Sequence, residues 1–198
     1  MEGKMTKRFP SKMITPEPGS LGQMIFENSS VGIPLRLQYD ISFSLKPFTL
    51  EEETVSTRIV LDSIKVPSRS WKHLAGMTYT FPVNPNEVYI DGSVYMFGVH
   101  NPADATRISF GKLNGLDLPV TIDLTIDFTY EGDEAYGVVP LTLKNVVKVQ
   151  PLRVISWVEE ECGHDPVRLS DKIHPLVDLN DFETPVVTGK SINYRPKG

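Results

Sequence analysis

The stretch Val120-Thr-Ile-Asp-Leu-Thr-Ile-Asp-Phe-Thr-Tyr130 alternates apolar and polar residues without a break. Successive side chains of a β-strand point to opposite faces, so this run predicts a strand with one dry face and one wet face. Such a strand is typical of an antiparallel sheet that covers a core on one side and meets water on the other. The predicted dry face comprises Val120, Ile122, Leu124, Ile126, Phe128 and Tyr130.

Two more segments continue this pattern. Residues 35–45 alternate in the same way and predict a second long strand. Residues 57–66 predict a third, but their apolar positions change parity after Leu61. A shift of one residue moves side chains to the other face, so it predicts a β-bulge or a bend between sheets.

Turn-forming residues separate the remaining strands. Asp91-Gly92 predicts a two-residue hairpin, with a continuous strand carrying a bulge as the alternative. Pro140 lacks the N–H that a central strand needs, so residues 136–149 are predicted to form an edge strand or a bulge. The last predicted strand covers residues 152–158.

Short strands at this spacing predict an all-β fold, an antiparallel β-sandwich or a flattened barrel, over residues 35–158. Residues 1–34 are rich in Pro and Gly and predict an irregular N-terminal arm, with a possible edge strand at 21–26. Residues 159–198 show no sustained periodicity and predict an irregular C-terminal extension. Helical patterns of ten residues do not alternate with the strands, which disfavours a βαβ fold.

Charge is unevenly distributed along the chain. The net charge is -5, and residues 1–12 and 190–198 each sum to +3, which leaves -11 for residues 13–189. Nucleic-acid binding depends largely on neutralising phosphates, so we expect no nucleic-acid partner. An acidic body suits a basic protein partner, because opposite fields speed and orient encounter.

The location is predicted to be cytoplasmic. Cys162 is the one cysteine, so the chain holds no internal disulfide, as expected in a reducing compartment. The basic residues 1–12 are not followed by the apolar segment of a secretory signal. No run approaches the ~18 apolar residues of a membrane helix, so we expect no membrane partner.

The segment with the most potential metal ligands or nucleophiles contains Cys162 and His164, and His174 follows ten residues after His164. Zinc sites usually need two close pairs of ligands, and this pattern has a single cysteine. Glu159–Glu161 precede the thiol and disfavour a thiolate nucleophile, because negative charge raises a thiol pKa. The segment is therefore predicted to be a solvated acidic turn, with no metal and no cofactor.

Other catalytic constellations are weak as well. His100 and Asp104 flank an Asn-Pro pair, which turn chemistry explains without a general base. Asp123 and Asp127 lie about 13 Å apart along a strand, too far for the carboxylate pair of a glycosidase. Phosphate-binding loops and hydrolase motifs are missing from the sequence. These observations favour a binding protein over an enzyme.

Our leading hypothesis is a protein-binding module that presents an acidic face to a basic partner, for example a cytoplasmic inhibitor or an immunity-type protein. The predicted partner-binding residues are Asp123, Asp127, Glu131, Asp133 and Glu134. One alternative is a β-sandwich that binds a carbohydrate or small ligand through surface aromatics, since aromatic residues concentrate binding energy. The aromatics considered are Trp71, Tyr89 and Tyr95. Another alternative is a structural subunit of a phage or secretion assembly.

Overall fold

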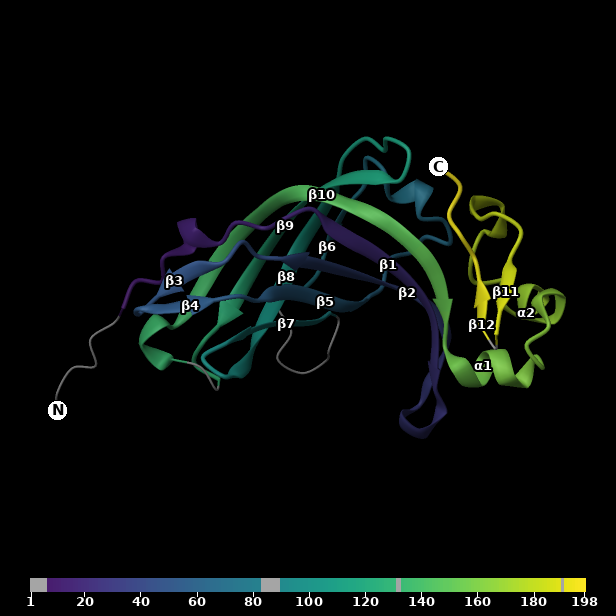
Figure 1. The fold of residues 1–198 in the computed structure, drawn as a ribbon, viewed down its shortest axis with the longest axis horizontal. Coiled ribbons are helices and arrows are strands. Elements are labelled where there is room, and N and C mark those ends of the chain that lie inside the picture. Colours follow the sequence, from purple (N-terminus) through teal and green to yellow (C-terminus); the bar gives the residue numbers. More distant parts are fainter. Residues whose placement is uncertain (1–6, 83–89, 131–132, 190) are drawn as a thin grey trace.

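The computed structural model describes residues 7–82, 90–130, 133–189 and 191–198 (Figure 1). Its strands are β1 (Gly19–Asn28), β2 (Ile33–Ser44), β3 (Phe48–Leu50), β4 (Glu53–Val55), β5 (Arg58–Ile64), β6 (Thr78–Thr80), β7 (Asp91–Met96), β8 (Val99–Phe110), β9 (Asp117–Asp127), β10 (Val138–Val154), β11 (Val186–Thr188) and β12 (Ser191–Asn193). Its helices are α1 (Ser156–Glu161) and α2 (Pro166–Ile173), with short 3-10 helices at η1 (Ser11–Met13), η2 (Ser29–Val31), η3 (Lys72–Leu74), η4 (Glu134–Tyr136) and η5 (Leu179–Asp181).

The main sheet closes on itself. Its strand order is β6-β8-β7-β5-β2-β1-β10-β9, and β9 also pairs with β8. This extra pairing joins β9 to the other side of the sheet, so the strands enclose a flattened barrel (Figure 1). The predicted all-β class is confirmed.

The alternating run that predicts the fold is β9. Its inward side chains from Leu118 to Phe128 are all buried, while Asp123 and the other residues between them are partly exposed. Tyr130 is the exception, because β9 ends at Asp127 and the Tyr130 side chain is 71% exposed. The alternation therefore predicts the buried face correctly up to the end of the strand.

The N-terminal segment differs from our expectation of an irregular arm with an edge strand. β1 lies inside the sheet, antiparallel to β2 on one side and parallel to β10 on the other. Gly22 is needed there, since a Cβ would stand 2.2 Å from the Asp40 carboxylate. Pro16 and Pro18 precede β1, so neither occupies a position within the strand, and Pro16 forms an isolated bridge with Leu45.

The change of parity in the third strand is a β-bulge, as predicted. Tyr39 pairs with Ile64 and Ile41 pairs with Leu61, which leaves one extra residue on β5. Ser63 takes up this residue with a positive φ of 61°. The bulge lets Leu61 and Ile64 both face the core despite their odd spacing.

The predicted hairpin turn at Asp91-Gly92 is wrong, because both residues lie within β7. Gly92 serves close packing instead, since a Cβ there would meet the carbonyl oxygen of Ala103 at 1.9 Å. The turn falls at Phe97-Gly98, where Met96 pairs with Val99 across a two-residue loop. Residues 87–89 of the expected hairpin lie outside the described residues.

β10 explains how Pro140 is accommodated. The first part of this strand, which contains Pro140, pairs with β9, whereas β1 pairs with β10 from Val147 onward. At Pro140 the strand therefore has one neighbour, and the predicted edge position is confirmed. β10 ends at Val154, so the last predicted strand at 152–158 is the end of β10 followed by α1.

The C-terminal segment is folded, in contrast to our expectation of an irregular extension. We call residues 156–189 and 191–198 the C-terminal lobe; it contains α1, α2, β11 and β12. The Asp165 side chain caps α2 by accepting hydrogen bonds from the N–H groups of Val167 and Arg168. Both helices are shorter than ten residues, so their periodicity is too brief to be recognised in the sequence. In the described part of the chain, no helix is long and apolar enough to cross a membrane.

A candidate docking surface at one end of the barrel

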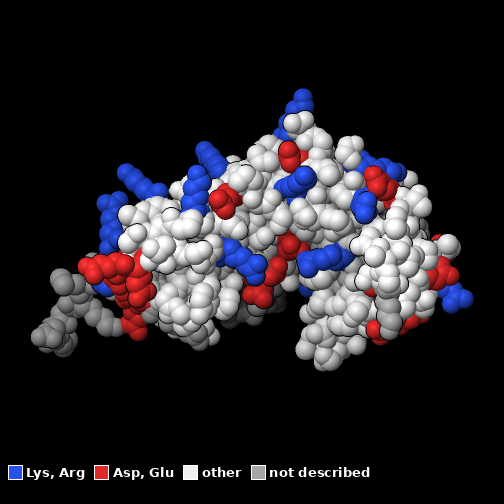
Figure 2. Space-filling model, in the orientation of Figure 1, with Lys and Arg blue, Asp and Glu red and all other residues white. Residues whose placement is uncertain are grey.

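Acidic side chains from two distant parts of the sequence gather at one end of the barrel. We call this surface the acidic end; it comprises Glu51, Glu52 and Glu53 at the β3–β4 turn, and Asp127, Asp133 and Glu134 near the connection from β9 to β10. Figure 2 shows acidic side chains concentrated at the left of the molecule, where β3 and β4 lie, with basic side chains above them.

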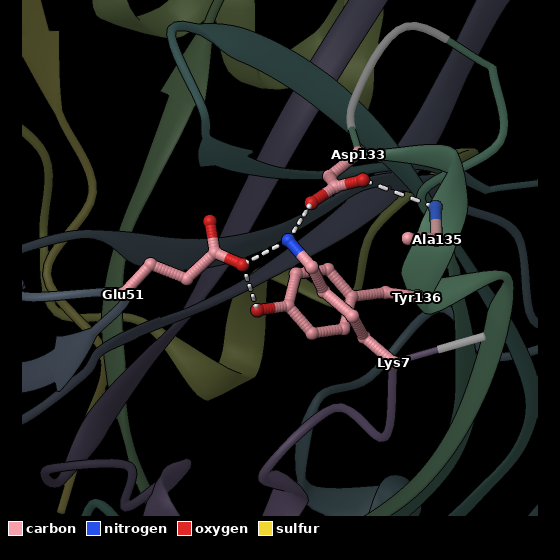
Figure 3. A network of polar contacts seen from close by, with 5 residues as sticks. All are labelled: Lys7, Glu51, Asp133, Ala135 and Tyr136. Atoms are coloured by element: carbon pink, nitrogen blue, oxygen red, sulfur yellow. Dashed lines mark hydrogen bonds and ion pairs between the residues drawn. The ribbon is translucent and has the colours of Figure 1, made fainter. Parts of the chain in front are cut away.

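Lys7 joins the two parts of the acidic end (Figure 3). Its ammonium group forms ion pairs with Glu51 and with Asp133, the latter at 3.1 Å from Nζ to Oδ2. The Tyr136 hydroxyl donates a hydrogen bond of 3.1 Å to the same Glu51 carboxylate. The Lys7 backbone N–H also donates to the carbonyl of Ala135 at 2.8 Å. Residues before β1 are therefore attached to the connection between β9 and β10.

The electrostatics of this network follow from its hydrogen bonds. The pKa of Lys7 is raised by its bonds to Glu51 and Asp133. The pKa of Glu51 is lowered by Lys7 and then by Tyr136. The pKa of Asp133 is lowered mainly by the Ala135 N–H and then by Lys7. At neutral pH all three charges are fully developed.

An aromatic cluster lies beneath the network. Phe9 stacks on Phe128 with ring centroids 4.8 Å apart and meets Tyr136 edge-on at 5.4 Å. Phe97 reaches the same cluster from the β7–β8 turn, at 5.7 Å from Phe128 and 5.6 Å from Tyr136. Phe9 and Phe128 are buried, which ties the acidic end to the core of the barrel.

Phe97 has an unusual backbone conformation. Phe97 and Gly98 have φ angles of 59° and 77°, the pattern of a type I′ turn, in which Asn-Gly is the preferred pair. A bulky residue at positive φ is strained, and strain of this kind is concentrated at functional sites. The Phe97 side chain is nevertheless 38% exposed. The Phe97 ring therefore both packs on the aromatic cluster and offers part of its surface to solvent.

Exposed apolar side chains accompany the acidic residues. Tyr130 and Val138, which flank the connection between β9 and β10, are both largely exposed. Val138 lines a cavity of about 390 Å³, together with Lys7, Arg8, Phe9 and Tyr136. Aromatic residues are enriched at the centre of protein interfaces, and polar or charged groups surround them at the rim.

The predicted partner-binding residues separate into two groups. Asp127, Asp133 and Glu134 belong to the acidic end, whereas Glu131 lies outside the described residues. Asp123 lies in the middle of β9, where it accepts hydrogen bonds from Arg107 at 2.7 Å and from the Thr142 hydroxyl at 2.8 Å.

The neighbours of Asp123 affect its pKa and balance its charge. The bond from Thr142, followed by that from Arg107, lowers the pKa of Asp123. The carboxylate is therefore ionised, but its charge is balanced by the Arg107 guanidinium within the chain.

The aromatics of the alternative ligand site do not form a surface platform together. Trp71 is 0% exposed, so its assignment as a surface aromatic is corrected: its indole is part of the core. Tyr89 lies outside the described residues. Tyr95 is 50% exposed on β7, where its ring contacts His100 with centroids 5.1 Å apart.

The catalytic candidates remain dispersed. Cys162 is buried in the C-terminal lobe, and among the described residues no group of three His, Cys, Asp or Glu side chains is arranged to hold a metal. His100 and Asp104 are separated by four positions on β8, or about 13 Å of strand. Burial, followed by the charge of Asp127, raises the pKa of Asp104.

Sequence reasoning missed Lys7, Glu51, Phe97 and Tyr136 as members of one site. The run Glu51–Glu53 was a visible signal, but its position beside Asp133 depends on how the barrel closes. Phe97-Gly98 carries no familiar turn signature because phenylalanine is rare at positive φ. No protein-family model, curated protein or solved structure matches this chain. Fold and site together define a flattened all-β barrel with an acidic, aromatic end.

Proposed function

We propose that this chain is a non-enzymatic protein-binding module whose acidic end docks onto a basic protein. The observation that carries the proposal is that Lys7 brings Glu51 of the β3–β4 turn together with Asp133, beside the aromatic cluster that includes the strained, exposed Phe97. The carboxylates supply attraction and orientation for a basic surface, and the aromatic ring supplies desolvated contact area.

The arrangement suits an inhibitor in particular. A cytoplasmic protein of the immunity type, which covers the basic active site of a toxin, is the concrete form we favour. Such a partner favours a preorganised acidic surface, and here Lys7 joins two of the acidic residues, Glu51 and Asp133, while Tyr136 of the aromatic cluster donates a hydrogen bond to Glu51. Rigid anchors lose little conformational entropy on binding, which favours high affinity.

The test is affinity capture of partners from the native cell with matched charge variants. Glu52→Lys with Glu53→Lys reverses two exposed charges at the acidic end, and Glu160→Lys with Asp171→Lys makes the same change on α1 and α2. We expect a basic protein to be captured by the wild type and by the helix variant. Capture by the acidic-end variant should fall at least about tenfold, as expected for an interface with steering charges.

A purified partner must then bind directly, with an affinity that falls between low salt and about 1 M salt, where the screening length is about 3 Å. The proposal is overturned if the two double variants capture the same proteins to the same extent, or if the affinity of the purified partner is independent of salt.

A further inference from the structure

A second surface, remote in sequence from the acidic end, carries two cationic side chains, Arg69 and Lys72. A cavity of about 880 Å³ is formed mainly by the connection between β5 and β6, with Asp178 of the C-terminal lobe on one side. Its lining residues include Pro67, Ser68, Arg69, Ser70, Lys72, His73, Ala75, Met77, Tyr79 and Asp178. We call it the basic cavity.

The segment that carries the cationic residues is held by buried neighbours. Ser70, Trp71 and Leu74 are all buried, and between them Arg69, Lys72 and His73 reach the cavity wall. A rigid segment of this kind presents its charged groups without a large ordering cost on binding.

Hydrogen bonds to the C-terminal lobe fix the segment further. The Ser70 hydroxyl donates to the buried carboxylate of Asp181 at 2.5 Å. The Arg69 carbonyl accepts a hydrogen bond of 2.7 Å from the Asp178 N–H, and the Arg69 guanidinium donates to the carbonyl of His174. The cavity is therefore built where the barrel and the lobe are joined.

The cations retain capacity for a ligand. Arg69 has five N–H donors in a planar fork, and its contact with His174 is to a neutral carbonyl. The Lys72 ammonium lies 3.9 Å from the Asp181 carboxylate and 5.3 Å from the Trp71 ring centroid, which holds it at the wall with a loose ion pair. The acidic lining residue, Asp178, directs its carboxylate to the N–H groups of Asn180.

The remaining wall is apolar or aromatic. Pro67, Ala75, Met77 and Tyr79 line it. Burial raises the pKa of Tyr79, so its hydroxyl stays protonated at neutral pH and is a donor. An Arg fork and a Lys ammonium that line one cavity suit a doubly charged oxyanion, and the apolar wall suits a flat organic group attached to it.

We infer that the basic cavity binds a small phosphomonoester, with the phosphate between Arg69 and Lys72 and its organic group against Met77 and Tyr79. This site is independent of the acidic end and of its partner. His73 adds an N–H donor at the rim, since it is exposed and lines the same cavity.

The test uses phenyl phosphate as the probe, with inorganic phosphate and benzyl alcohol for comparison, titrated into the ¹⁵N-labelled full chain and followed by NMR. We expect phenyl phosphate to cause saturable amide shifts confined to residues 67–79 and Asp178. Inorganic phosphate should bind the same residues more weakly, and benzyl alcohol should not bind measurably. Equal affinities of phenyl phosphate and inorganic phosphate would overturn the role of the apolar wall.

Variants decide whether the cations hold the phosphate. Arg69→Met with Lys72→Met should weaken phenyl phosphate binding at least about tenfold, as expected for loss of charged hydrogen bonds. The control Lys46→Met with Arg58→Met removes the same charges elsewhere and should bind like the wild type. Arg69→Gln alone provides a milder change that keeps a side-chain donor for His174.

A well-dispersed spectrum establishes that each variant is folded. The inference fails if phenyl phosphate binds the Arg69 and Lys72 variants as tightly as the control variant. It fails equally if the shifts are spread over all basic surfaces without saturation.

Discussion

Lys7 and Asp133 are 126 positions apart in the sequence, yet their side chains form an ion pair of 3.1 Å. The same ammonium group binds Glu51, so one cation from the N-terminal segment balances carboxylates on both sides of the acidic end (Figure 3). A lysine from a basic partner would find here a site already shown to accept an ammonium group. Lys7 therefore competes with any such partner.

Removing this competitor should strengthen binding. We expect Lys7→Met to bind a fluorescent octalysine peptide roughly threefold more tightly than the wild type, because an exposed ion pair is weak and its loss frees Glu51 and Asp133. Fluorescence anisotropy measures the change at low salt. Lys46→Met, which removes an exposed lysine elsewhere, is the control. Equal gains in both variants would indicate a general charge effect and contradict the competition.

Phe97 should matter for binding more than for folding. Phe97→Asn places the preferred residue of a type I′ turn at positive φ, which offsets part of the lost ring packing. We expect a folded protein whose affinity for a purified partner falls at least about tenfold, as for an aromatic anchor of an interface. Circular dichroism checks the fold and calorimetry the affinity. Undiminished affinity would show that the strained turn serves the fold alone.

The Lys7 network should lose its effect in acid. The pKa values of Glu51 and Asp133 are lowered in the folded state. Their stabilising contribution is therefore present above the ordinary carboxyl pKa of about 4 and is lost as the pH falls through the lower, folded-state values. Glu51→Gln should be slightly less stable than the wild type at pH 7 in urea unfolding. The difference should disappear near pH 3, and a constant difference would contradict the ionic origin.

The opposite behaviour is expected at Asp62. Asp62 and Asp91 lie directly opposite each other on β5 and β7, and burial, followed by the charges of Asp40 and Asp91, raises the pKa of Asp62. A raised carboxyl pKa lowers stability as the pH rises from the ordinary carboxyl pKa of about 4 to the raised, folded-state value, and like charges opposite each other cost about 0.5 kcal/mol.

Asp62→Asn should therefore raise the melting temperature at pH 7 and leave it nearly unchanged at pH 3. Thermal unfolding at both pH values is the measurement. Ser93→Ala, a neutral change on the neighbouring strand, is the control and should show no such dependence on pH. A loss of stability at pH 7 would contradict the repulsion between Asp62 and Asp91.

Close packing at Gly92 gives a stability prediction of a different origin. Gly92→Ala places a methyl group 1.9 Å from the Ala103 carbonyl oxygen, so β7 and β8 must separate. We expect a loss of about 2 kcal/mol or more in urea unfolding, as for an overpacked core. A variant as stable as the wild type would show that the two strands separate easily.

The sequence predicts best what depends on local alternation. Val120–Phe128 predicts both β9 and its buried face, because period-two burial is local, and the change of parity after Leu61 predicts the bulge at Ser63. The hairpin fails for the same local reason: Asp91-Gly92 has turn chemistry, but Gly92 is required by a contact with Ala103 on another strand. Local signals therefore do not distinguish a turn glycine from a packing glycine.

The candidate site is less predictable because it is built by long-range pairing. Asp127, Asp133 and Glu134 stand close together in the sequence, which predicts that they share one surface. Lys7 and Glu51 join them only through tertiary contacts. Asp123 was assigned to the same surface, but Arg107 from the neighbouring strand neutralises it, and a single sequence does not specify that pairing.

The parallel pairing of β1 with β10 has a consequence for how the protein is made. Gly19 lies beside Val147, so a strand synthesised early stays without one of its neighbours until the chain has grown past β10. Contacts between residues so distant in sequence slow folding, because the chain between β1 and β10 must lose entropy before the two strands can pair. We therefore expect the barrel to close only after β10 has emerged from the ribosome, and β1 to depend until then on β2 alone to cover its backbone.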